Sequence, residues 1–113
     1  MDLVGRIAIV TGGGTGLGAQ VCRRLVEAGV RVGVNFSRSE EAARDLASTL
    51  GADVAHAVRA DVRDETSVSR MVAEVQERFG GAVELLVNNG GVTTYAATAD
   101  LESVRPTGSG SLP

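Results

Sequence analysis

A glycine-rich stretch near the start of the chain has the residue types and spacing to bind a phosphate group. Five glycines fall within residues 11–18, after the apolar run 7–10 and before a segment of helical apolar periodicity, 17–28. Because glycine has no Cβ, the backbone can turn sharply there and a phosphate can approach it closely. A helix beginning near Gly16 would direct its unpaired N–H groups and the positive end of its dipole at that phosphate. The stretch predicts a phosphate-binding turn; the alternative is a tight turn that binds no ligand.

The spacing of these glycines fits a general dinucleotide-binding fingerprint. Gly14, Gly16 and Ala19 stand at the positions Gly-x-Gly-x-x-Ala. The strand expected before them and the helix expected after them are the context that the fingerprint requires. A second register, Thr-Gly-x-x-x-Gly-x-Gly, begins at Thr11. We prefer the second register because it starts where the strand should end.

The loop after the second expected strand carries an arginine where an NAD-binding chain would carry an acid. The fingerprint places an acidic residue about twenty positions on, where it binds the ribose 2′-hydroxyl of NAD. Here the loop 35–39 contains Arg38, and the first acid is Glu40, which we expect in the next helix. A guanidinium suits a 2′-phosphate, which a carboxylate would repel. Arg38 therefore favours NADP over NAD, which stays possible; the alternative is a solvated loop arginine.

Two further candidate positions follow the third and fourth expected strands. Asp61 could accept a hydrogen bond from an adenine amino group, and the backbone N–H of Val62 could donate to the ring. Asn88 and Asn89 could join neighbouring loops and face a ribose. Each has a plain alternative: Asp61 as a turn or helix N-terminal residue, and the asparagines as turn residues.

An alternating α/β fold would bring these candidate positions to one edge of a sheet. Apolar runs predict strands at residues 6–11, 30–34, 54–58 and 83–87, and apolar periodicity predicts helices at 16–28, 39–50 and about 68–79. Right-handed crossovers then give a doubly wound parallel sheet of Rossmann type with strand order 3-2-1-4, the first two helices on one face and the third on the other. The fourth strand would be an exposed apolar edge, open to self-association. We expect one domain, 1–104, and a flexible tail, 105–113.

Composition narrows the functional class. The chain has 113 residues, 43% hydrophobic and 22% charged, which is ordinary for a globular domain. Its net charge of −3 and few aromatic residues argue against nucleic acid or an anionic membrane as partner. With the single cysteine Cys22, no transmembrane-length segment and no signal-peptide pattern, we expect the cytoplasm. We interpret Cys22, His56 and Tyr95 as structural, and expect no metal site.

Taken together, these motifs resemble the classical short-chain dehydrogenase/reductase family, whose pattern covers about residues 4–101. The matching pieces are the glycine stretch, Asp61-Val62 and the segment 88–91, in the family's order, and the segment 35–42 looks like the NADP-dependent 3-oxoacyl-carrier-protein reductase branch. The resemblance implies that the pyrophosphate and nicotinamide side is held by Gly12, Gly14, Thr15, Gly16 and Leu17. It further implies Arg38 at the 2′-phosphate, Asp61 and Val62 at the adenine, and Asn88 with Gly90 at the ribose.

The chain departs from the family in two ways. Gly90 stands where the family usually has alanine. Family members are roughly twice as long, and the other half carries a serine and a Tyr-x-x-x-Lys pair, whereas these 113 residues contain no lysine. We therefore expect no catalytic residue here, but the NADP-binding half of a carbonyl reductase or alcohol dehydrogenase, inactive alone. It would act on a small carbonyl or alcohol only if a catalytic half were supplied. The alternatives are a non-catalytic dinucleotide-binding or interaction module, and a decayed truncated product.

Overall fold

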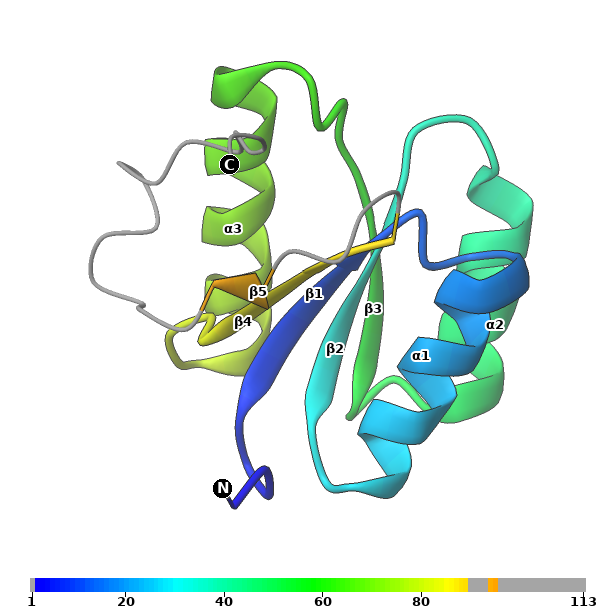
Figure 1. Cartoon of the computed structure of the whole chain (residues 1–113), viewed down its shortest axis with the longest axis vertical. Coiled ribbons are helices and arrows are strands. Elements are labelled where there is room, and N and C mark those ends of the chain that lie inside the picture. The colour runs from blue at the N-terminus through cyan, green and yellow to red at the C-terminus, as the bar shows by residue number, and fades with distance from the viewer. Residues whose placement is uncertain (1, 90–93, 96–113) are drawn as a thin grey trace.

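A five-stranded sheet with helices on both faces forms the framework (Figure 1). The computed structural model describes residues 2–89 and 94–95, so the predicted boundary between residues 104 and 105 lies outside the described part. The strands are β1 (Ile7–Thr11), β2 (Arg31–Phe36), β3 (Ala55–Arg59), β4 (Leu85–Asn88) and β5 (Thr94–Tyr95). The helices are α1 (Gly16–Glu27), α2 (Glu40–Leu50) and α3 (Glu65–Phe79).

The four parallel strands have the predicted order 3-2-1-4. β1 lies at the centre, where Val10 pairs with Val34 of β2 on one side and with Val87 of β4 on the other. The chain passes from β1 through α1 to β2 on one side, and later from β3 through α3 to β4 on the other side of β1. The carboxyl ends of β1, β2 and β4 therefore meet at the switch point, which is where ligands bind in sheets of this kind.

The prediction that the fourth strand is an exposed edge was wrong. The short strand β5 lies antiparallel to β4, with Leu86 opposite Tyr95 and Val87 opposite Thr94. Sequence periodicity did not predict β5 because two residues are too short a run to show an alternation. The backbone of β4 is thus paired on both sides over Leu86 and Val87.

Two strand boundaries differ from the predicted ones by two residues, and the others by at most one. β2 continues two residues past Val34 because Asn35 and Phe36 pair with Val58 and Arg59 of β3. β4 begins at Leu85 rather than Val83. Glu84, just before it, donates its backbone N–H to the carbonyl oxygen of Ile7.

Helices α1 and α2 cover one face of the sheet and α3 the other, as predicted (Figure 1). Alternate residues of β1 separate the two cores: Ala8 and Val10 face α1 and α2, whereas Ile7 and Ile9 face α3. All of β1 is buried, which is typical of a central parallel strand. No helix in the described part of the chain has the length and apolar character needed to cross a membrane.

Gly33 of β2 permits α3 to lie close to the sheet. A Cβ added there would stand 2.7 Å from a methyl carbon of Val75. Asp64 caps the N-terminus of α3, where its side chain accepts a hydrogen bond from the Thr66 N–H, and Gly80 caps the C-terminus in the left-handed conformation. These contacts fix the start of α3, which forms one wall of the cavity described next.

Candidate functional site

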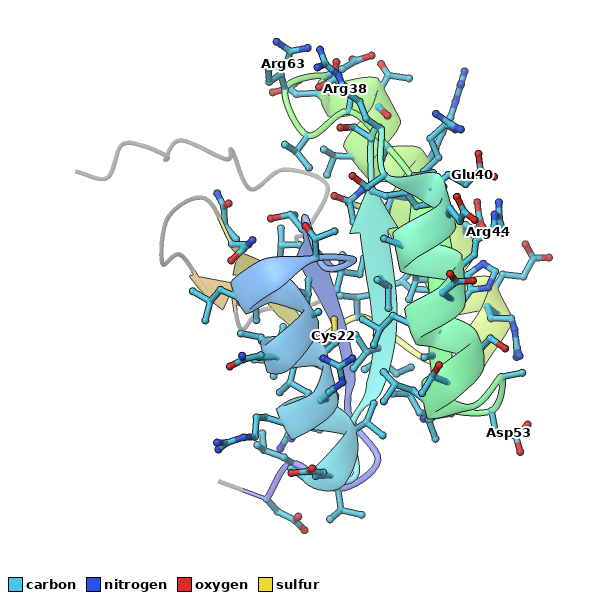
Figure 2. All side chains as sticks on the ribbon, turned by 90° about the vertical axis from the view of Figure 1, so that its right-hand side faces the viewer. Cys22, Arg38, Glu40, Arg44, Asp53 and Arg63 are labelled. Carbon is cyan, nitrogen blue, oxygen red and sulfur yellow. The ribbon has the colours of Figure 1, made fainter. Side chains whose placement is uncertain are left out.

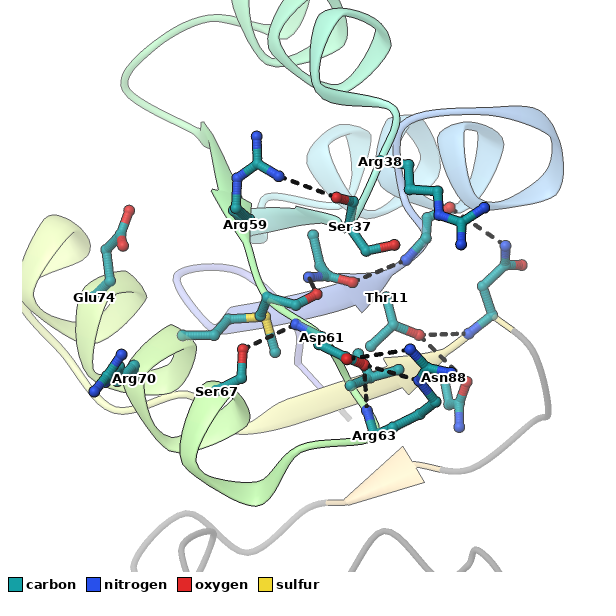
Figure 3. Close-up of a pocket in the computed structure, with 16 residues that line it drawn as sticks. Thr11, Ser37, Arg38, Arg59, Asp61, Arg63, Ser67, Arg70, Glu74 and Asn88 are labelled. Atoms are coloured by element: carbon teal, nitrogen blue, oxygen red, sulfur yellow. Dashed lines mark hydrogen bonds and ion pairs between the residues drawn. The ribbon is translucent and has the colours of Figure 1, made fainter.

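A cavity of about 1060 Å³ opens at the carboxyl ends of the parallel strands (Figure 3). Its walls come from the loops after β1, β2, β3 and β4 and from the first half of α3. Of the candidate residues singled out from the sequence, those that line the cavity are Gly12, Arg38, Asp61, Val62, Asn88 and Asn89. The fold thus brings together candidates from four separate loops.

Asn35 joins three of these loops and was not predicted as a site residue. It is only 3% exposed, yet its side chain is fully hydrogen-bonded. Its Oδ1 accepts from the Gly12 N–H at 3.2 Å, and its Nδ2 donates to the carbonyl oxygen of Ala60 at 3.2 Å. Its own backbone oxygen accepts from the Gly13 N–H at 3.0 Å. The sequence carried one signal for this role: a polar amide side chain stands between the apolar residues Val34 and Phe36.

A second set of contacts joins the end of β1 to the end of β4. The Thr11 hydroxyl lies 3.3 Å from Oδ1 of Asn88 and accepts a hydrogen bond from the Asn89 N–H at 3.0 Å. The Nδ2 of Asn89 donates to the carbonyl oxygen of Gly12 at 3.3 Å. The asparagines therefore bridge loops, as the sequence predicted. Gly90, the remaining ribose candidate, lies outside the described residues.

The turn between β1 and α1 presents an open helix N-terminus. Gly16 has φ +56°, and a Cβ added to it would meet no atom within 4 Å. Thr15 is extended and makes no side-chain cap bond, and the first turn of α1 carries no acid. Leu17 is 66% exposed. The start of α1 is therefore exposed at Gly16 and Leu17 and has no side-chain cap from Thr15, which fits a pyrophosphate group.

Gly14 and Gly18 serve packing within the protein. A Cβ on Gly14 would stand 2.9 Å from the backbone nitrogen of Ala43 in α2. A Cβ on Gly18 would stand 2.2 Å from the carbonyl oxygen of Gly12. Gly14 thus lets α2 approach the turn, whereas the space beside Gly16 is open.

Arg38 is an exposed side chain on the cavity wall, in the loop between β2 and α2 (Figure 3). It has no hydrogen-bond or ion-pair partner among the described residues. Asp61, across the cavity, is held by Arg63, whose Nε lies 3.1 Å from Asp61 Oδ1. Hydrogen bonds from the Arg63 side chain and backbone lower the pKa of this carboxyl. A free guanidinium and an ionised carboxylate therefore occupy different walls of the cavity.

Cys22, His56 and Tyr95 take places consistent with a structural role. Cys22 is fully buried, and burial raises the pKa of its thiol to about 12. The Nε2 of His56 lies 2.8 Å from Oε2 of Glu74, which joins β3 to α3. Tyr95 belongs to β5. Within residues 2–89 and 94–95, no three acidic, histidine or cysteine side chains gather as metal ligands would.

The chain is similar to known proteins in sequence and in structure. A homologue from Bacillus subtilis, the short-chain dehydrogenase/reductase homolog YusS, is 35% identical over 105 residues, which are 91% of this chain and 95% of that protein. The 3-ketoacyl-(acyl-carrier-protein) reductase from Brucella melitensis, solved in complex with NADH, superposes with a TM-score of 0.67 at 33% identity. A blue fluorescent protein from a metagenomic library, solved with NADPH, gives 0.71 at 33% identity.

The extent of these matches differs between the relatives. The Brucella comparison covers 74% of this chain but 34% of that one, and the NADPH complex 81% and 38%. This chain therefore spans little more than a third of the two solved structures, but nearly all of the Bacillus homologue. The family model of the short chain dehydrogenases matches residues 6–106. By this match and by its glycine turn, parallel sheet and strand-end residues, the chain belongs to the short-chain dehydrogenase family.

Proposed function

We propose that this chain binds NADP(H) at the carboxyl edge of its sheet. The observation that carries the proposal is that the open N-terminus of α1 and the guanidinium of Arg38, which has no partner among the described residues, come from adjacent loops, with Arg38 lining the cavity. The N-terminus of α1 suits a pyrophosphate, and the guanidinium of Arg38 suits a 2′-phosphate. NADH and NADPH in the two similar structures support a nicotinamide dinucleotide as the ligand class.

Each wall of the site has a proposed role toward the dinucleotide. The backbone from Gly12 to Leu17 binds the pyrophosphate and nicotinamide side, with Gly14 shaping the turn and Thr15 and Gly16 exposed. Arg38 binds the 2′-phosphate. Asp61 and the N–H of Val62 bind the adenine, and Asn88 with Gly90 binds the ribose. When bound, the cofactor supplies a hydride acceptor or donor for a carbonyl or alcohol group.

Hydride transfer by these 113 residues alone is not expected. The family uses a tyrosine as general acid and a lysine that lowers its pKa, and the sequence contains no lysine. We propose that the chain is the cofactor-binding half of a carbonyl reductase or alcohol dehydrogenase. A small ketone or secondary alcohol would then be reduced or oxidised only when a catalytic half is present.

Calorimetric titration tests the binding proposal directly. The full chain is titrated with NADPH and NADH, as wild type and as Arg38→Ala. A charge-assisted contact contributes about 1.5–3 kcal/mol, so Arg38→Ala should weaken NADPH binding by about ten- to a hundredfold and leave NADH unchanged. Arg23→Ala, which removes an exposed arginine of α1 outside the cavity, is the charge-matched control. A folded chain that binds neither cofactor at millimolar concentration contradicts the proposal.

A second candidate is a dinucleotide-binding module that never takes part in hydride transfer. It is favoured by the match to 95% of the Bacillus homologue, which has nearly the same extent. Adding a separately made catalytic half from a related reductase distinguishes the two. NADPH oxidation in the mixture supports the half-enzyme, whereas tight binding without oxidation supports the module.

A further inference from the structure

Arg59, the last residue of β3, bridges both sides of the loop that carries Arg38. Its Nη1 donates to the carbonyl oxygen of Ser37 at 3.1 Å, and its Nη2 donates to Oε1 of Glu40 at 2.8 Å. Ser37 precedes Arg38, and Glu40 is the first residue of α2. One planar guanidinium therefore holds the loop at two points around Arg38. Figure 3 shows the contact with Ser37.

The guanidinium group of Arg59 lies over the ring of Phe36. The guanidinium carbon of Arg59 lies 5.1 Å from the centre of the ring, and that of Arg44 lies 5.7 Å from it. Phe36 itself is 2% exposed at the end of β2. Stacking on a fixed ring restricts where a long side chain can lie, so Arg59 loses less freedom when it bridges Ser37 and Glu40.

Both carboxylate oxygens of Glu40 are occupied. Oε1 accepts from Arg59, and Oε2 accepts from the Nε of Arg44 at 2.7 Å. Hydrogen bonds and charge from Arg44 and Arg59 lower the pKa of this carboxyl. Glu40 lies beside Arg44 on α2 and is not part of the cavity wall (Figure 2). The first acid after β2 is thus bound and turned away from the place where an acid would contact a ribose.

We infer that Arg59 is a positioning residue that sets the preference of the site for a 2′-phosphorylated dinucleotide. It fixes the loop on which Arg38 stands by binding it on both sides, at the carbonyl oxygen of Ser37 and at the carboxylate of Glu40. The inference rests on the proposed function, since it concerns how the same site distinguishes NADPH from NADH. A residue with only a structural role would change the affinity for both cofactors together.

Substitution of Arg59 separates these two roles. Arg59→Ala should lower the NADPH affinity by about tenfold, the size of one lost charge-assisted contact, and leave the NADH affinity unchanged. Arg44→Ala is the matched control, because it removes a guanidinium from the same ring and the same carboxylate but leaves the bridge to Ser37 in place. The control should change the ratio of the two affinities by less than twofold.

Hydrogen exchange gives a second measurement that needs no cofactor. The Glu40 N–H donates to the carbonyl oxygen of Arg38 at 2.9 Å, so its exchange rate reports whether the loop is held. It should exchange at least about threefold faster in Arg59→Ala and at the wild-type rate in Arg44→Ala.

The possible outcomes distinguish the two proposals. A wild-type preference for NADPH that survives Arg59→Ala, or an exchange rate that does not change, overturns the role of Arg59 and leaves the binding proposal intact. A wild type that binds neither cofactor overturns the binding proposal and the specificity role with it. Loss of affinity for both cofactors in Arg59→Ala shows a structural role only.

Discussion

The side-chain oxygen of Asn35 accepts a hydrogen bond from the N–H of Gly12 at 3.2 Å, across the switch point of the sheet. The same side chain donates to Ala60, just before Asp61. One buried amide at the end of β2 thus determines where the turn after β1 and the loop after β3 lie. These two loops and the loop after β2, which carries Arg38, all contain residues proposed to bind the cofactor. The relative positions of these residues therefore depend on Asn35.

Asn35→Leu should therefore destabilise the fold and the site together. Leucine has a similar volume but leaves the Gly12 N–H and the Ala60 carbonyl without their partner, at a cost of about 1–3 kcal/mol in the free energy of unfolding. Urea denaturation measures this loss. Asn89→Leu, which removes a hydrogen bond to Gly12 at the more exposed side of the turn, is the control and should cost less than about 1 kcal/mol. Equal losses in the two variants would contradict the role given to Asn35.

Gly16→Ala should abolish much of the dinucleotide binding for a reason separate from stability. Its φ of +56° disfavours a side chain by about 1–2 kcal/mol, and the added methyl group would stand on the open surface offered to the phosphate. Gly80→Ala is a close control, since Gly80 has φ +74° and an equally empty surrounding at the far end of α3.

Both glycine variants should lose similar free energy of unfolding, but only Gly16→Ala should lose NADPH affinity, by about tenfold or more. Calorimetric titration at a temperature where both variants are folded checks this. If Gly80→Ala loses as much affinity as Gly16→Ala, general destabilisation explains the effect and the phosphate site is not at Gly16.

The parallel sheet was predictable because its signal is strong and local. Four apolar runs alternate with helical periodicity, and the handedness of crossovers leaves one strand order for a switch point after the first strand. Helices α2 and α3 end at Leu50 and Phe79, as the sequence predicted. The edge was not predictable, because β5 is only two residues long and pairs with β4 through backbone groups that any residue carries.

The site was predictable only at the level of its loops. Arg38 and Asp61 follow strands, so topology alone brings them to one edge of the sheet. That Gly14 lies against Ala43 and that Arg59 bridges the Arg38 loop depend on contacts between distant segments. No periodicity in a single sequence encodes such contacts.

The Asp61–Arg63 pair should affect stability in acid. Hydrogen bonds from Arg63 lower the pKa of Asp61 in the folded chain, so the folded state holds the carboxylate more strongly than the unfolded state does. The resulting stability is present above the unfolded pKa of about 3.9 and is lost as the pH falls below it. Arg63→Ala should move the Asp61 pKa back toward its ordinary value, measured by NMR titration of the carboxyl carbon. An Asp61 pKa that is the same in both proteins would rule out this pairing in solution.

Cys22 should make the chain less stable in alkali. Burial raises the pKa of its thiol to about 12 in the folded chain, against about 8.5 when unfolded. The contribution of the Cys22 thiol to the free energy of unfolding is complete below about pH 8.5. It is lost as the pH rises toward the folded pKa, because in that range the thiol ionises only in the unfolded chain.

Urea denaturation from pH 7.5 to 10 measures this effect. The free energy of unfolding should fall by up to about 1.4 kcal/mol per pH unit above pH 8.5. Cys22→Ala, which leaves a small cavity under the glycine turn, should be less stable at every pH but should lack this slope. Parallel pH profiles for the two proteins would show that the thiol ionises as readily in the folded chain as in the unfolded one. That result would mean that the contact between Cys22 and the Gly13 carbonyl, at 3.7 Å, is open to solvent and that the glycine turn is not packed on α1.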